Sequence, residues 1–383
     1  MIMKKAVLLL ITAMICLLMY TPAIYASEGN SDSVSLPGLT YDHSMELSYA
    51  EEFQVDYYED GYALITIEQE GQYLVVPEGK EAPEGLDVSV TVLKQPLNQI
   101  YLVATSAMDL FRAIDCMDRI RLSGTKEDGW YIPEAVEKMK EGNILYAGKY
   151  NAPDYEQILS QSCGLAVEST MIHHNPEVKE KLEQFGIPVL VERSSYENHP
   201  LGRTEWMKLY AVLFDKEKLA EQLFQEQKDR LDTVLAADST GKTVAFFYIN
   251  STGAVNIRKS NDYVSRMIEL AGGIYLPADT GEDDNALSTM NMQMEEFYAK
   301  AKEADYIIYN STIDGELNTI DDLLAKSSLL SDFKAVKNQN VWCTGKNLFQ
   351  ETTGLGTMIE DIHILLTTDD PSLEKLTYMH RLK

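Results

Sequence analysis

A long amphipathic segment occupies the middle of the chain. Its first apolar positions follow the helical spacing i, i+3, i+4 and i+7, and they are Trp206, Leu209, Tyr210 and Leu213. Apolar residues continue in the same stripe as far as Leu235, among Lys, Glu, Gln and Asp, with no proline or further glycine before Gly241. The pattern predicts one uninterrupted linking helix over residues 203–238, roughly 50 Å long at the usual rise per residue.

The two halves that this segment joins repeat the same order of parts. In each half a helical pattern leads into a short apolar strand, then a Ser-Thr pair, then a second helix; the pairs are Ser169-Thr170 and Ser311-Thr312. Short apolar strands between helices favour mostly parallel sheets, whose ligands sit beyond the carboxyl ends of the strands. We expect an α/β protein with two Rossmann-like lobes facing a shared cleft. Two independent α/β domains without a shared site are the alternative.

The first 26 residues have the pattern of a secretory signal peptide. Lys4 and Lys5 precede an apolar run, and Ala26 offers a small residue at the cleavage position. A signal helix retained as a membrane anchor is the competing interpretation. Cys16 follows Met14 and Ile15, where lipoprotein signals favour small residues, so we do not expect it to carry a lipid.

The remaining boundaries follow from composition and periodicity. Residues 27–89 contain a polar tether and alternating aromatic runs around Asp60-Gly61, which predict a small β addition with a hairpin. Residues 90–202 then form the N-terminal α/β lobe, beginning with a strand at 90–93, and residues 239–383 form the C-terminal lobe and tail.

Charge limits the class of partner, and cysteine content limits the kind of structural cross-link. The chain has 33 basic and 60 acidic residues and a formal net charge of −27, which opposes binding to nucleic acid and to anionic membranes. Beyond the signal peptide three cysteines remain, Cys116, Cys163 and Cys343, without a Cys-x-x-Cys pair, so neither a disulfide framework nor a zinc knuckle is indicated.

Sequence motifs favour a binding protein over an enzyme. The sequence has no Gly-x-Ser-x-Gly, no Walker-type phosphate loop and no His-Glu-x-x-His. We expect no catalytic residue and no resident cofactor. The alternative is a metal- or tetrapyrrole-handling enzyme, or a sensor, on the same scaffold; its weak candidate ligands are His173 and His174, in the loop that begins near Glu168.

Loops at the ends of the predicted strands supply the candidate ligand contacts. They combine basic side chains, which suit an anionic ligand in so acidic a protein, with hydroxyl groups and flat aromatic walls. The candidates are Ser106, Lys149, Tyr150, Ser169, Met171, Arg193, Tyr248, Arg258, Ser260, Lys346 and Phe349. The competing interpretation pairs Arg193 with Glu192 and Arg258 with Asp262.

The order of parts resembles the solute-binding proteins of ATP-driven importers for iron complexes, haem and cobalamin, from about Val90 onward. Three stretches carry the resemblance: the glycine loop and Glu-containing helix of 147–159, the helix-to-strand step of 182–189, and the helix ending in a glycine pair at 267–273. The resemblance implies two α/β lobes joined by one long helix, with the ligand held between them.

The resemblance also implies function and partners. We expect an extracytoplasmic, monomeric protein that captures a ferric, siderophore-like complex with limited closure of its lobes, and does not bind nucleic acid. It would deliver the complex to a membrane permease with a cytoplasmic ATPase. The family meets permease arginines through one surface acid per lobe; Glu177 matches the first position, and Glu316, Asp321 or Asp322 the second, with Glu316 preferred.

Overall fold

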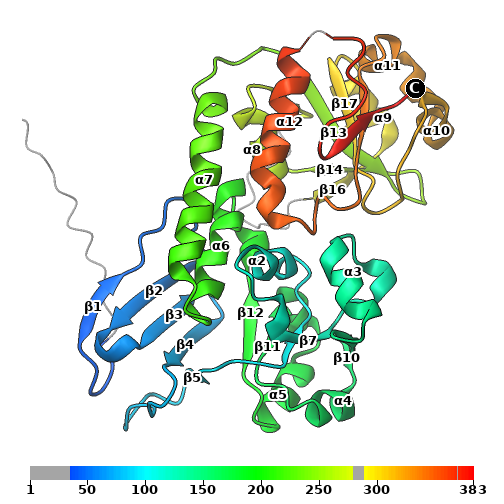
Figure 1. The fold of residues 1–383 in the computed structure, drawn as a ribbon. Helices are drawn as coiled ribbons and strands as arrows, with labels where there is room; N and C mark the ends of the chain where they lie inside the picture. The colour runs from blue at the N-terminus through cyan, green and yellow to red at the C-terminus, as the bar shows by residue number, and fades with distance from the viewer. Residues whose placement is uncertain (1–34, 279–288, 369) are drawn as a thin grey trace, which may run out of the picture. The chain divides into compact units, whose positions relative to one another are not determined.

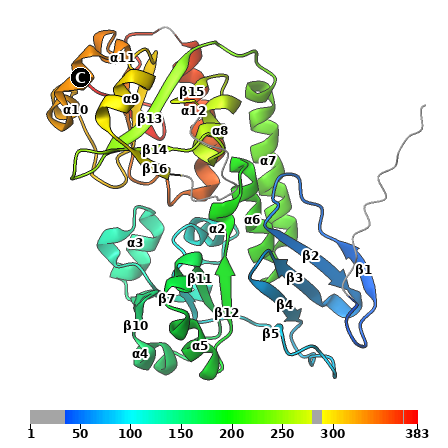
Figure 2. The same ribbon diagram turned by 180° about the vertical axis from the view of Figure 1, so that it is seen from behind.

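The computed structural model describes residues 35–278, 289–368 and 370–383, so the predicted signal peptide lies outside the described residues. Residues 36–383 form one unit that contains an added N-terminal sheet and two α/β lobes (Figures 1 and 2). Within the described ranges, no helix combines the length and the apolar character needed to cross a bilayer.

The predicted β addition is a five-stranded sheet. Its strands, in chain order and in sheet order, are β1 (Tyr41–Ser44), β2 (Phe53–Tyr58), β3 (Ala63–Ile67), β4 (Gly71–Val76) and β5 (Val90–Lys94). The predicted hairpin is confirmed: Asp60 and Gly61, with φ of 65° and 85°, turn β2 into β3. The prediction that Val90 begins the N-terminal lobe is wrong, because β5 pairs in parallel with β4 and completes the added sheet.

The N-terminal lobe contains a wholly parallel sheet, as predicted. Its strand order is β12-β11-β6-β7-β8, and the strands are β6 (Ile100–Leu102), β7 (Ile120–Ser123), β8 (Leu145–Tyr146), β11 (Ala166–Ser169) and β12 (Val189–Glu192). Its helices are α2 (Ala107–Ala113), α3 (Pro133–Lys140), α4 (Tyr155–Ser160) and α5 (Pro176–Gln184). A short hairpin of β9 (Gly148–Lys149) and β10 (Ala152–Pro153) follows β8. The parallel strands place their connecting loops at one edge of the sheet.

The C-terminal lobe contains a mixed sheet around a parallel centre. Its strands are β13 (Thr243–Ile249), β14 (Val255–Arg258), β15 (Ile274–Leu276), β16 (Thr289–Met292), β17 (Tyr306–Tyr309), β18 (Val341–Thr344) and β19 (Met379–Arg381). Strands β13, β15, β17 and β18 are parallel, and β14, β16 and β19 pair antiparallel at the margins. The helices are α8 (Tyr263–Leu270), α9 (Met294–Ala301), α10 (Ile320–Lys326), α11 (Lys334–Lys337) and α12 (Leu355–Thr367).

The predicted uninterrupted helix over 203–238 is wrong. The segment forms two helices, α6 (Pro200–Val212) and α7 (Glu217–Leu235), and Asp215 between them has a φ of 56°. The helices lie side by side in both views (Figures 1 and 2), and the Lys208 ammonium of α6 lies 4.6 Å from the Phe224 ring of α7. Folding back buries the apolar stripes of both helices in one core, which a single straight helix could not do.

One hydrophobic core connects the added sheet to both lobes. It includes Phe53 of β2, Leu102 of β6, Trp206 of α6 and Ile362 of α12, all nearly inaccessible to solvent. Separate apolar clusters lie under α9 and α11 in the C-terminal lobe and under α4 and α5 in the N-terminal lobe. The shared core ties the added sheet to the two lobes within residues 36–383.

Candidate functional site

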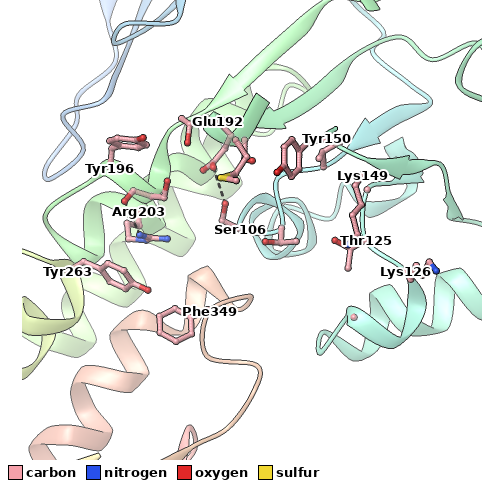
Figure 3. Close-up of a pocket in the computed structure, with 18 of the residues that line it drawn as sticks. Ser106, Thr125, Lys126, Lys149, Tyr150, Glu192, Tyr196, Arg203, Tyr263 and Phe349 are labelled. Carbon is pink, nitrogen blue, oxygen red and sulfur yellow. Dashed lines mark hydrogen bonds between the residues drawn. The ribbon is translucent and has the colours of Figure 1, made fainter. Parts of the chain in front are cut away.

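A cavity of about 750 Å³ lies at the carboxyl ends of the N-terminal lobe's strands (Figure 3). Residues from the loops after β6, β7, β11 and β12 form most of its wall, and the C-terminal lobe contributes Arg258, Tyr263 and Phe349. This is the edge at which ligands of parallel α/β sheets bind, because the strand-to-helix loops gather there.

Two arginines from different elements flank the same aromatic ring. The Arg203 guanidinium of α6 lies 4.0 Å from the Tyr263 ring centroid, and that of Arg258 lies 5.9 Å from it. Arg258 is also 4.9 Å from the Phe349 ring, and its terminal nitrogen is 3.5 Å from the Asp262 carboxylate. Guanidinium groups stack on aromatic faces and still direct N–H donors outward, so this cluster can present donors to an anion.

The buried acid Glu192 lines the same cavity as these arginines. The Ser106 hydroxyl and the Ser194 backbone N–H each donate to the Glu192 carboxylate at 2.9 Å, and Figure 3 shows the first of these bonds. Burial raises the pKa of Glu192, while the bonds from Ser194 and Ser106 and the charge of Arg203 oppose that rise. The two donors and the Arg203 charge thus compensate the buried carboxylate within the wall.

The cavity wall is more basic than the chain as a whole. Lys126 and Lys149 line the N-terminal side, so the wall has four basic residues with Arg203 and Arg258. Its acids are Glu192 and the exposed Asp128. A wall of this kind favours a ligand with negative charge, despite the net charge of −27.

Most of the predicted ligand contacts lie on this wall. Seven do so: Ser106, Lys149, Tyr150, Ser169, Met171, Arg258 and Phe349. They come from both lobes, so the structure brings them together in one cavity. Their contacts with a ligand remain predictions.

The prediction that Arg193 faces the cleft is wrong. Its side chain is 6% exposed, its Nε donates to the Glu52 carboxylate at 2.7 Å, and a terminal nitrogen lies 3.6 Å from Glu70. Glu52 lies in the segment that enters β2, and Glu70 lies between β3 and β4 of the added sheet. Arg193 follows β12 directly and turns to these acids, whereas Tyr196, three residues later, lines the cavity.

Three further predicted contacts do not line the cavity either. Tyr248 packs against the C-terminal lobe's own core because it belongs to strand β13. Ser260 is solvent-exposed in the turn between β14 and α8. Lys346 lies 5.8 Å from the Tyr131 ring at the surface of the opposite lobe. Position at a strand end is therefore not enough to place a side chain in the cleft.

Several cavity residues were not predicted from the sequence. They are Thr125, Lys126, Glu192, Tyr196, Arg203 and Tyr263. Lys126 follows strand β7, and the strand-end rule could have found it. Arg203 and Tyr263 belong to the first turns of α6 and α8, where the sequence shows only an amphipathic pattern.

The candidate metal ligands His173 and His174 lie at the protein surface. His173 Nε2 lies 2.9 Å from the Glu70 carboxylate, and both His173 and His174 are exposed. In the described part of the chain, no three His, Cys, Asp or Glu side chains gather closely enough to hold a metal ion. Glu168, at the start of this loop, is fully buried; neither carboxylate oxygen has a hydrogen-bond partner, and burial raises its pKa to about 8.

The predicted docking acids are at the surface. Glu177 is exposed in the first turn of α5, where the Asn175 amide donates to it at 3.3 Å. Glu316 is exposed on the C-terminal lobe and accepts the Lys346 N–H at 3.2 Å. The alternative Asp322 caps α10 by accepting backbone N–H groups, which leaves it less suited to a partner's arginine.

Residues 120–348 match a family model described as periplasmic binding protein. An uncharacterized lipoprotein of Methanocaldococcus jannaschii is 24% identical, over 93% of this chain and 87% of its own length. A second uncharacterized lipoprotein of the same organism is 24% identical, over 76% of this chain and 74% of its own length.

Solved structures share the fold. A periplasmic haem-binding protein of Vibrio cholerae matches 71% of this chain and 99% of its own, with a TM-score of 0.58 and 17% identity. A periplasmic vitamin B12-binding protein of Vibrio cholerae matches 71% and 97%, with a TM-score of 0.52 and 18% identity. A protein of an Fe³⁺-hydroxamate transport system from Saccharomonospora viridis matches 71% and 94%, with a TM-score of 0.54 and 20% identity.

The predicted α/β fold of two lobes with a cleft is thereby confirmed. The family model spans more than half of the chain, and the cavity lies where the strand-end loops of the matched region meet the C-terminal lobe. The chain therefore belongs to the periplasmic binding protein family.

Proposed function

We propose that this protein captures an anionic, siderophore-like iron complex in the cleft and delivers it to a membrane permease with a cytoplasmic ATPase. The observation that carries the proposal is the pair Arg203 and Arg258, which flank Tyr263 at the cavity. Guanidinium groups donate two parallel hydrogen bonds to carboxylate-like oxygens, and aromatic rings provide flat contact area for an organic chelator.

The composition of the wall favours a chelated metal over a bare ion. The described cavity residues offer lysine, arginine and hydroxyl donors and aromatic rings, with two acids between them. Cationic donors repel a bare metal ion but attract the negatively charged chelator around it. The protein would then recognise the outer surface of the complex, and the chelator would keep its metal.

Delivery would use the two exposed acids. Glu177 and Glu316 lie on different lobes, and each has a surface carboxylate that a permease arginine could reach. Charge reversal of both, with Glu177→Arg and Glu316→Arg, would reduce uptake in a reconstituted transporter without changing ligand affinity. Loss of ligand affinity in that variant would contradict a docking role.

Export by a signal peptide and a monomeric state complete the proposal. The names of the two Methanocaldococcus jannaschii relatives call them lipoproteins, which makes a lipid on Cys16 the alternative to cleavage after Ala26. Intact-mass spectrometry of the exported protein distinguishes these outcomes, because the mature chain would begin at residue 27 or at a lipidated Cys16. Sedimentation of the same sample tests the monomer.

Binding is tested by quenching of tryptophan fluorescence in residues 27–383. The probes are a ferric hydroxamate complex, a ferric catecholate complex, haem, cobalamin and free Fe³⁺. We expect saturable quenching by one anionic complex, weakened about 10- to 100-fold by Arg203→Gln or Arg258→Gln, in line with about 1.5–3 kcal/mol for a charged hydrogen bond.

The matched control is Arg266→Gln, because Arg266 is half-exposed on α8, pairs with Glu269 and does not line the cavity. It should leave the affinity unchanged. Equal losses in Arg266→Gln and Arg203→Gln would contradict the proposal. A response to Fe³⁺ alone that His173→Ala abolishes would favour the metal-handling alternative instead.

A further inference from the structure

The added sheet is joined to α6 and to the loop before it through two buried carboxylates, Glu205 of α6 and Glu197 of the loop. Residues 48–52, the segment that enters β2, have five consecutive backbone N–H groups that donate to these acids. Glu205 accepts those of Ser48, Tyr49 and Ala50 at 2.9, 2.8 and 2.9 Å, and Glu197 accepts those of Glu51 and Glu52 at 2.9 and 3.0 Å. We call this contact between residues 48–52 and the carboxylates of Glu197 and Glu205 the seam; its five hydrogen bonds lie between 2.8 and 3.0 Å.

Each of the two buried carboxylates has one further partner, a hydrogen-bond donor or an opposite charge. The Trp206 indole donates to Glu197 at 2.8 Å, and the Lys208 ammonium lies 3.0 Å from Glu205. A side chain at Gly202 would place its Cβ only 2.9 Å from the Tyr49 carbonyl oxygen, so glycine allows the two segments to approach. Several residues of α6 and of the loop before it therefore contribute to the seam.

Arg193 connects this seam to the cavity wall. On one side it donates to Glu52, which ends the seam segment, and it lies 3.6 Å from Glu70, which precedes β4. On the other side its guanidinium lies 4.2 Å from the Tyr196 ring centroid. Tyr196 lines the cavity on the same wall as Arg203, as Figure 3 shows.

Glu70 reaches a second cavity loop as well. Its side chain is 2% exposed, and its carboxylate lies 2.9 Å from His173 Nε2. His173 belongs to the turn Thr170–His174, whose residues Thr170 and Met171 line the cavity. The added sheet therefore touches the loops after β11 and β12 through one buried acid.

We infer that the added sheet braces one wall of the ligand cavity and that Arg193 is a positioning residue, which holds Tyr196 in place from behind. Residues 41–94, which contain the added sheet, lie outside the segment that the family model matches. The consequence for ligand affinity rests on the proposed function, whereas the brace itself does not.

Hydrogen exchange of the ligand-free chain tests the brace directly. Arg193→Gln should raise amide exchange several-fold in residues 192–197 and leave exchange in β13 and β17 of the C-terminal lobe unchanged. Arg193→Lys, which keeps the charge, should give a smaller increase. Lys94→Gln is the matched control, because Lys94 of β5 pairs with the exposed Glu81 in the connection between β4 and β5 and does not line the cavity.

Unchanged exchange in 192–197, or a rise throughout the chain, would overturn the inference. A double-mutant cycle then measures the effect on binding, with a ferric hydroxamate complex as the probe. Arg193→Gln should weaken binding about tenfold alone and hardly at all in a Tyr196→Ala background. Independent effects of the two substitutions would overturn the positioning role, while failure of the probe to bind would count against the proposed function only.

Discussion

The Asp109 carboxylate accepts both the backbone N–H and the hydroxyl of Thr353, at 2.7 and 2.6 Å, and thereby joins α2 of the N-terminal lobe to the segment before α12. Nearby, the Thr352 hydroxyl donates to the Ser106 carbonyl oxygen, and the Thr204 hydroxyl donates to the Thr352 carbonyl oxygen. These bonds lie beside the cavity and restrain the two lobes, which fits the predicted limited closure.

Asp109→Ala should lower the free energy of unfolding by about 3–5 kcal/mol, because Asp109 is fully buried and the substitution leaves Arg112 and Thr353 without their shared partner. Thr353→Val should cost only about 1 kcal/mol, since the backbone bond remains. Urea unfolding measures both. Glu269→Gln, which breaks an exposed ion pair, is the control at about 0–1 kcal/mol; a similar small loss for Asp109→Ala would contradict the prediction.

Gly202→Ala should destabilise the protein by about 1–3 kcal/mol, because its Cβ would lie 2.9 Å from the Tyr49 carbonyl oxygen and force the seam apart. Gly356→Ala is the matched control in α12, where the nearest atom is a Leu231 methyl carbon at an ordinary 3.4 Å. The control should be neutral or stabilising by about 0.5–1 kcal/mol, since alanine favours helix. Thermal unfolding that ranks the two variants the other way would refute the close approach.

Glu168→Gln should remove a pH dependence of stability. Burial raises the pKa of Glu168 from 4.5 to about 8, so the folded protein retains a proton that the unfolded chain loses as the pH rises. The wild type should therefore lose stability from about pH 4.5 to about pH 8, by up to about 1.4 kcal/mol per pH unit, relative to the variant. Urea titrations across this range measure the difference, and parallel curves would show that Glu168 is ionised in the fold.

His199→Asn should reduce sensitivity to mild acid. Burial and the charge of Arg266 lower the pKa of His199 from 6.5 to about 4, so its contribution to stability is present above pH 6.5 and lost as the pH falls toward 4. Asparagine can still accept the Leu201 N–H at the start of α6, as the histidine ring does. The variant's melting temperature should fall less than that of the wild type between about pH 7 and about pH 5; an equal fall would contradict the assignment.

Local patterns predicted much of this fold. The alternating aromatic runs on either side of Asp60-Gly61 form the predicted hairpin, because a tight turn between two amphipathic strands is specified by neighbouring residues. The loop Ser169-Thr170-Met171 lines the cavity because the end of a parallel strand determines on which edge of the sheet its loop lies. Predictions of this kind depend on few residues and on short-range geometry.

Other features depend on contacts that periodicity does not encode. No proline or glycine marks a break across 213–216. The chain nevertheless turns there, because α6 and α7 bury apolar surface when they fold against each other. Strand β5 has the pattern of any buried strand, and only its pairing with β4 assigns it to the added sheet.

The sequence by itself determined most of the strands and helices, the two-lobe fold and the edge of the sheet where the cavity forms. The tertiary structure decided the direction of individual side chains: Arg193, at the end of a strand like the true cavity residues, instead meets Glu52, 141 positions away. The physical reason is that helix and strand periods are set by neighbouring residues, whereas the partner of a buried charge is whichever opposite charge the packed fold brings to it.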